Sequence, residues 1–171
     1  AVARFMDRFQ AHWKIVIRAK LGLGEDERDG DQDLIRDLLV TLYEQKADYT
    51  LTFRRLADAA EDAHRDAALG ALLEDPAALT PWLSVWRGRL SQDATTASAR
   101  AQAMRKANPA FIPRNHKVDE ALTAAVDHGD FSLFEALNDV LSKPYTDQPA
   151  FAPYAEPPKP GEEITATFCG T

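Results

Sequence analysis

The sequence predicts an all-α protein: an irregular bundle of about six to eight short helices, followed by an extended, proline-rich C-terminal tail. Apolar residues recur every three or four positions over most of the first 143 residues, as at Phe5, Phe9, Trp13 and Ile17. Glycine, asparagine and aspartate interrupt this pattern at short intervals, and no heptad repeat is sustained. From residue 144 onward prolines dominate, and they favour extended chain over helix.

The first half of the chain predicts three helices. The first ends near Leu21, where Gly22 provides a C-terminal cap. An acidic loop over 24–33 leads to the second, which Asp31 or Asp33 caps and whose apolar face runs from Leu34 to Tyr43. The third begins after Asp48 or Thr50 and is able to continue through an alanine-rich stretch toward residue 73.

The second half predicts four more helices. One starts at Thr80-Pro81, with threonine as the cap and proline at the first helical position, and an alanine-rich one covers 93–107. A non-helical connector over 111–116 precedes a helix from Val118 to Gly129. Asp130 caps the last helix, whose inward positions are Phe131, Phe134, Leu137, Val140 and Leu141. We therefore place a helical domain at 1–143 and the extended tail at 144–171.

Composition excludes several classes of function. The net charge is −7, with basic and acidic residues interspersed, whereas a nucleic-acid surface needs clustered basic residues. No apolar run approaches the roughly 20 residues that span a bilayer. The first residues are amphipathic and acidic, unlike a secretion signal. We expect a cytoplasmic protein that binds neither nucleic acid nor membranes.

One loop imitates a calcium-binding loop but lacks its key ligand. With Gly30 at the glycine position, five acidic residues fall on ligand positions: Glu25, Glu27, Asp29, Asp31 and Asp33. The twelfth position, which needs a bidentate glutamate, is Arg36. The four histidines have no recognised metal-ligand spacing. We expect a solvated loop with a helix cap, and no metal site.

Two further segments allow a functional and a structural interpretation. In the connector, two prolines would hold Arg114, Asn115 and His116 in fixed positions, where they could contact a phosphate or another domain. The same groups could instead satisfy the open ends of helices. The segment 47–54 packs Tyr49 and Phe53 one turn apart, which suits either a capped helix start or a docking face.

The single cysteine, Cys169, lies in the last five residues. Structural cysteines are usually buried, so a thiol on a tail favours chemistry over packing. One cysteine makes no internal disulfide, but it could pair with another chain or domain. No glycine-rich phosphate loop or catalytic constellation is present. We therefore assign no catalytic, cofactor-binding or metal-binding residue in this chain.

Seven sequence strings occur in a recognisable order along the chain: residues 9–23, 47–56, 108–116, Glu120-Ala121, Gly129-Asp130-Phe131, Pro144-Tyr145 and Cys169-Gly170-Thr171. This ordered set resembles the C-terminal part of the selenoprotein O (SelO/YdiU) family. The resemblance covers nearly the whole chain and ends in a cysteine at the family's position for selenocysteine or cysteine.

The resemblance implies a kinase-like enzyme that transfers AMP from ATP to protein hydroxyl groups with a divalent metal, Mg or Mn. It places the catalytic, ATP-binding and metal-binding residues in an N-terminal kinase-like region outside this chain. That region and the protein substrates are the implied partners. Only Cys169 maps onto a functional position, as a redox-active residue that pairs with a cysteine of the catalytic region.

Two hypotheses follow. In the first, this chain is the C-terminal helical portion of a SelO-like protein adenylyltransferase, inactive alone, which braces the kinase-like core and carries a redox-active tail. In the second, it is a free-standing helical interaction module whose thiol is incidental. The coding sequence upstream of Ala1 would distinguish them.

Overall fold

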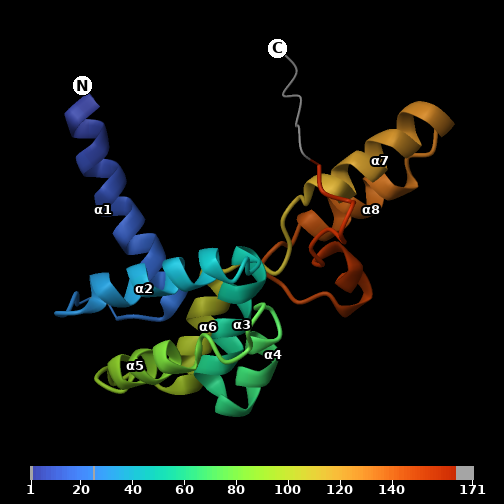
Figure 1. Ribbon diagram of the computed structural model, residues 1–171. Coiled ribbons are helices and arrows are strands. Elements are labelled where there is room, and N and C mark those ends of the chain that lie inside the picture. The colour runs from blue at the N-terminus through green and yellow to red at the C-terminus, as the bar shows by residue number, and fades with distance from the viewer. Residues whose placement is uncertain (1, 25, 165–171) are drawn as a thin grey trace. The chain divides into compact units, whose positions relative to one another are not determined.

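The computed structural model describes residues 2–24 and 26–164, and within them it is entirely helical (Figure 1). No strand occurs in these ranges, which confirms the predicted all-α class. The elements are α1 (Val2–Leu21), α2 (Asp31–Glu44), α3 (Tyr49–Glu61), η1 (Ala63–Arg65), α4 (Asp66–Gly70), α5 (Thr80–Leu90), α6 (Ala97–Ala107), α7 (Asn115–His128), α8 (Ser132–Leu141) and η2 (Pro149–Tyr154), where η marks a 3-10 helix.

The chain divides into two compact units, Ala1–Asn108 and Pro109 onward. The first contains α1 to α6, and the second contains α7, α8 and η2. Helices α7 and α8 therefore share a unit with the start of the proline-rich segment. The boundary at 143/144 marks a change in composition, and as a domain boundary it stays a prediction.

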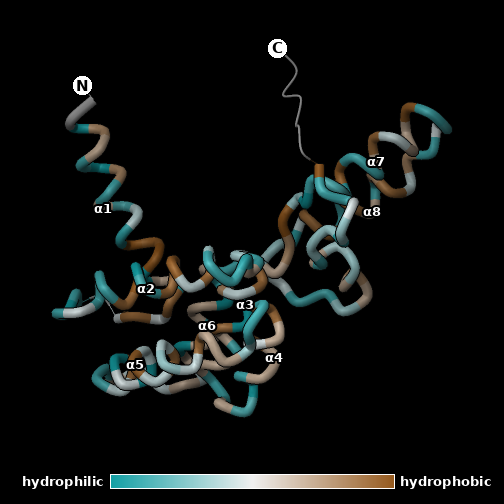
Figure 2. Tube along the Cα trace, in the orientation of Figure 1, coloured by the Kyte–Doolittle hydropathy of each residue, from teal (hydrophilic) through white to brown (hydrophobic). Residues whose placement is uncertain are grey.

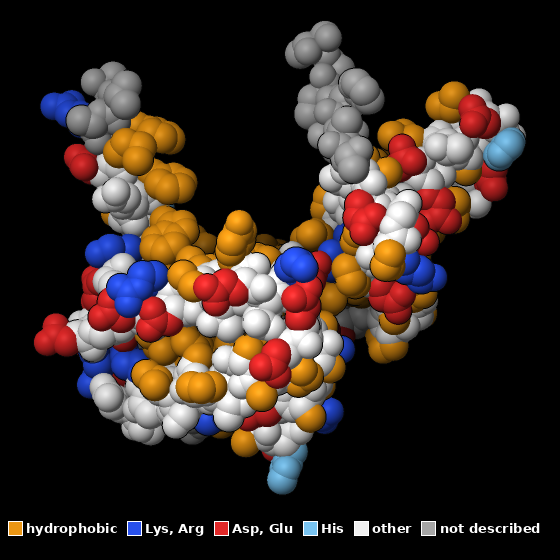
Figure 3. Space-filling model, in the orientation of Figure 1, with side chains coloured by type: hydrophobic (Ala, Val, Ile, Leu, Met, Phe, Trp, Pro, Cys, Tyr) orange, Lys and Arg blue, Asp and Glu red, His pale blue; other side chains and the backbone are white. Residues whose placement is uncertain are grey.

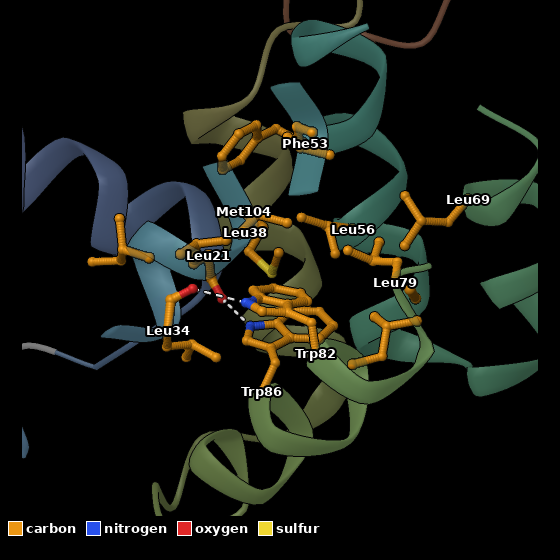
Figure 4. Packing of buried hydrophobic residues seen from close by; sticks show 14 of the residues in the cluster. Leu21, Leu34, Leu38, Phe53, Leu56, Leu69, Leu79, Trp82, Trp86 and Met104 are labelled. Carbon is orange, nitrogen blue, oxygen red and sulfur yellow. Dashed lines mark hydrogen bonds between the residues drawn. The ribbon is translucent and has the colours of Figure 1, made fainter. Parts of the chain in front are cut away.

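The first unit is built around two stacked tryptophans on α5. The rings of Trp82 and Trp86 lie 5.4 Å apart, centroid to centroid. Their indole N–H groups donate to the carbonyl oxygens of Leu34 (2.7 Å) and Leu21 (3.0 Å), as Figure 4 shows. These bonds satisfy the only polar atom of each ring, so the rings can be buried among leucines at no polar cost.

The end of α1 requires a glycine. Gly22 has φ of 68°, a left-handed conformation, and the N–H of Leu23 closes the turn onto the carbonyl of Arg18. A Cβ at Gly22 would lie 2.7 Å from the sulfur of Met104, so α6 also needs the missing side chain there. The predicted glycine cap is confirmed.

The second unit has a small core where α7 packs against α8. Its five buried apolar residues are Ala110, Phe111, Ala121, Leu137 and Val140. The N–H groups of Ala110 and Phe111 both donate to the carbonyl oxygen of Pro144, at 2.8 and 3.1 Å. This pairing ties the start of the unit to the end of α8.

Several details of the predicted helices are wrong. Helix α3 ends at Glu61, because Asp62 adopts an extended conformation and caps η1 through the N–H of His64. Gly30 and Leu79 occupy the N-cap positions of α2 and α5, in place of the aspartates and Thr80. Phe131 and Phe134 are exposed, whereas Leu137 and Val140 on the same helix are buried as expected.

The proline-rich stretch contains a helical element that was not predicted. Residues 149–154 form η2, with Pro149 in its first turn, where a missing N–H costs nothing. Phe151 and Tyr154 then pack against the small core of the second unit. Prolines thus exclude an α-helix here but still permit one short 3-10 turn.

Candidate functional site

The acidic loop between α1 and α2 is the most highly charged buried place in the described part of the first unit. Asp31 is almost fully buried, and its carboxylate accepts hydrogen bonds from two buried arginines, Arg18 of α1 and Arg89 of α5. The Nε of Arg89 lies 2.6 Å from Oδ1 of Asp31, and its Nη1 lies 2.9 Å from Oδ2 of Asp93. The backbone N–H of Arg28 donates to Asp31 at 3.0 Å.

This network occupies oxygen atoms of the loop that a calcium ion would need as ligands, and the absence of a metal site there stays a prediction. Arg18 also donates to the carbonyl oxygens of Gly24 and Asp26, the kind of oxygen that a calcium ion would need. Burial raises the pKa of Asp31, but the bonds from Arg89, Arg28 and Arg18 outweigh it and hold that pKa below its ordinary value. The carboxylate therefore stays ionised and joins three segments of the chain.

The segment 47–54 forms a second cluster around Lys20. The side chain of Asp48 caps α3 by accepting from the N–H of Leu51 at 2.8 Å. The rings of Tyr49 and Phe53 lie 4.5 Å apart, and the Lys20 Nζ sits 5.7 and 5.3 Å from their centroids. Burial lowers the pKa of Lys20 and raises that of Tyr49.

Asn108, which is fully buried, links this cluster to α6. Its Nδ2 donates to the carbonyl oxygen of Lys20 at 2.9 Å, and its Oδ1 accepts from Nζ of Lys20 at 3.1 Å. Arg54 donates to the carbonyl oxygens of Arg105 and Asn108, both at 3.0 Å. These bonds satisfy the C-terminal end of α6, which favours the structural interpretation of the segment.

The three connector residues begin α7. Arg114 is buried, and its carbonyl oxygen accepts from the N–H groups of Lys117 and Val118 at 2.9 and 3.0 Å. Asn115 is exposed and His116 is half-buried, both in the first turn of α7. The predicted non-helical connector therefore ends two residues earlier than expected, at Arg114.

His116 lines a shallow pocket of the second unit together with Lys117, Glu120 and Glu162. Lys117 donates to Glu120 at 2.9 Å, so part of the pocket's charge is already paired. That Arg114, Asn115 and His116 contact another domain stays a prediction. Cys169 lies outside the described residues, and its redox role stays a prediction as well.

The apolar residues whose spacing predicted α1 leave an exposed face on that helix, along which apolar and polar residues alternate (Figure 2). Figure 3 shows hydrophobic side chains gathered along one side of this helix. The face, named here the α1 stripe, consists of Phe5, Met6, Phe9, Trp13 and Val16, whose side chains are between 38% and 64% exposed. The four-residue spacing shows a helix face but not what covers it.

Comparison with known proteins assigns the chain to a family. A family model described as protein adenylyltransferase SelO matches residues 1–142. This chain belongs to the SelO family. Similar proteins include a protein nucleotidyltransferase YdiU from Rhizobium leguminosarum bv. trifolii (56% identical over 99% of this chain) and one from Rhizobium meliloti (55% over 100%). Another, from Rhodopseudomonas palustris, is 47% identical over the full chain.

These SelO relatives are much longer than the matched stretch. This chain spans 34% of the Rhizobium leguminosarum protein and 35% of the Rhizobium meliloti protein, or about one third of each. Within residues 2–24 and 26–164, no helix is both long and apolar enough to cross a membrane. In the same ranges, no three acidic, histidine or cysteine side chains gather as metal ligands.

Proposed function

We propose that this chain is the C-terminal helical portion of a protein adenylyltransferase, which transfers AMP from ATP to serine, threonine or tyrosine hydroxyls of other proteins. The match of residues 1–142 to the adenylyltransferase family model carries the proposal. The relatives extend over about three times the matched length, which leaves room for a separate catalytic region. The role of this portion is to brace that region.

No step of the transfer is assigned to residues of this chain. ATP and Mg or Mn would bind in the kinase-like region of the same protein, and the protein substrates would meet it there. Several buried polar side chains of the first unit are engaged with neighbouring groups: Asp31 with Arg18 and Arg89, and Asn108 with Lys20. They hold helices together, which suits a brace.

The test is AMP labelling of a generic protein substrate with labelled ATP and Mg²⁺ or Mn²⁺. The full-length protein and residues 1–171 are compared at equal concentration. We expect labelling by the full-length protein only. Labelling by residues 1–171 alone would show that this portion holds a catalytic site. No labelling by the full-length protein with either metal would refute adenylyl transfer and favour the free-standing interaction module.

We also propose that Cys169 is a redox-active residue. Its thiol would form a disulfide with a cysteine of the catalytic region, as the two thiols give two electrons and two protons to an oxidant such as glutathione disulfide. The full-length protein should then show an oxidised intramolecular cross-link on non-reducing gels, and Cys169→Ser should lack it. An equal response of labelling activity to reductant in wild type and Cys169→Ser would contradict this role.

A further inference from the structure

The N-terminal part of α1 stands apart from the other helices of the first unit (Figure 1). From Arg4 to Val16 no residue of α1 is buried, whereas Ile17, Arg18 and Leu21 are. About three turns of helix thus bury no side chain within the described part of the unit. An isolated helix of this length is marginal in water, so a packing partner would normally stabilise it.

The exposed part of α1 is strongly amphipathic. At 100° per residue, the five members of the α1 stripe fall within an arc of about 100°, the width typical of a face that packs on a core. Asp7 is exposed and projects about 160° away from Phe9. The stripe runs for roughly 17 Å along the helix, which is long enough to dock against a helix or groove. Large contiguous apolar faces of this kind usually mark interaction sites.

We propose that the α1 stripe docks against the part of the parent protein that lies outside residues 1–171. This inference rests on the proposed function only in taking this chain as a portion of a longer protein. About two thirds of each relative lies beyond the matched stretch, whereas α1 itself falls within it. The occupant is therefore a covalently attached region larger than this chain.

Tethering favours this occupant over a second copy of the chain. A tethered region is present at an effective concentration in the millimolar range. Two separate chains would instead lose translational and rotational freedom on association. The aromatic side chains of Phe5, Phe9 and Trp13 supply large apolar area with few rotatable bonds, which suits a stable contact within one protein.

The experiment is site-specific photo-crosslinking in the full-length protein. Benzoylphenylalanine replaces Phe9, where it keeps an aromatic ring in place, and in a matched control it replaces Asp7 on the opposite face. After irradiation, peptide mass spectrometry identifies the cross-linked partner. We expect intramolecular products from position 9 that join α1 to residues outside these 171, and not from position 7.

Three results would overturn the proposal: a product of doubled mass that joins two copies, a product that joins position 9 to residues 109–171, or equal or absent cross-linking at both positions. AMP labelling is measured on the same samples. Cross-linking as expected without labelling would refute adenylyl transfer and leave the docking surface intact. Labelling without the expected cross-link would support adenylyl transfer and refute the docking of the α1 stripe.

Discussion

Asp31 is a single buried side chain that joins three segments of the first unit. One carboxylate accepts hydrogen bonds from Arg18 on α1, Arg89 on α5 and the backbone of the intervening loop. A buried charge is tolerated only when it is paired and hydrogen-bonded, and here each partner comes from a different segment. The network therefore selects one arrangement of these segments.

Asp31→Asn should destabilise the protein by about 3 kcal/mol, at the lower end of the cost of breaking a buried ion pair. Arg89 would keep its hydrogen bond to Asp93, and Arg18 would keep its hydrogen bonds to two carbonyl oxygens. These remaining bonds limit the loss of stability. Urea unfolding followed by circular dichroism measures it. Asp33→Asn is the matched control, because Asp33 is exposed on the same turn, and it should change stability by less than about 0.5 kcal/mol.

The carboxylate of Asp31 should also make the stability of the protein depend on pH. The pKa of Asp31 is lower in the folded protein than in the unfolded chain, where it is about 4. Its contribution is therefore complete above pH 4 and is lost as the pH falls through the folded pKa. Below about pH 4 the stability of the wild type should fall more steeply than that of Asp31→Asn. Parallel curves for the two proteins would show that another group governs acid unfolding.

Among the elements, the junction of α1 with α6 depends on a glycine for two separate reasons. Gly22 needs a left-handed backbone, and its missing Cβ leaves room for Met104 and Arg100 of α6. Gly30, at the start of α2, also has a positive φ, but nothing lies within 4 Å of where its Cβ would be. Substitutions at Gly22 and Gly30 therefore allow the effect of backbone strain to be separated from that of steric overlap.

Gly30→Ala should cost about 1 kcal/mol, from the left-handed backbone alone. Gly22→Ala should cost about 2 to 4 kcal/mol, because the overpacking of α6 adds to the same strain. Thermal and urea unfolding of the two variants measure the difference. Equal losses would mean that the side chains of Met104 and Arg100 move aside without cost.

Helix ends were the least predictable feature of the elements. Sequence reasoning found the glycine that ends α1 and the proline in the first turn of α5, because glycine and proline differ most from other residues in their allowed backbone conformations. It missed the break after α3, since alanines alone would continue a helix and Asp62 is one of several possible caps. When several residues could cap a helix end about equally well, the packing around them decides which one does so.

For the whole molecule, the two units differ in how much apolar surface they bury. Trp86, Phe53, Leu38, Leu56 and their neighbours form a core that joins α1 to α6, whereas the core of the second unit has five members. Apolar burial is the main favourable term in folding, so the second unit should open at a lower free energy than the first.

Hydrogen exchange should reveal this difference. In the full chain, amides of α7 and α8 should exchange faster than those of α3 and α6 at neutral pH, as measured by mass spectrometry of peptides. Equal protection of all four helices would mean that the units unfold as one. The α1 amides before Ile17 should exchange fast in residues 1–171 and slowly in the full-length protein if the α1 stripe is covered there.

The sequence by itself determined the helical class, most of the helices and the family, because apolar periodicity and an ordered set of strings need no partner to be recognised. The tertiary structure alone decided that the acidic loop is closed by Arg18 and Arg89, residues 13 and 58 positions away from Asp31. It also decided which apolar faces are buried, since Ile17 and Phe9 belong to the same periodic pattern but Ile17 is buried and Phe9 is exposed. Periodicity records that a face is apolar, whereas burial depends on which distant segments reach that face.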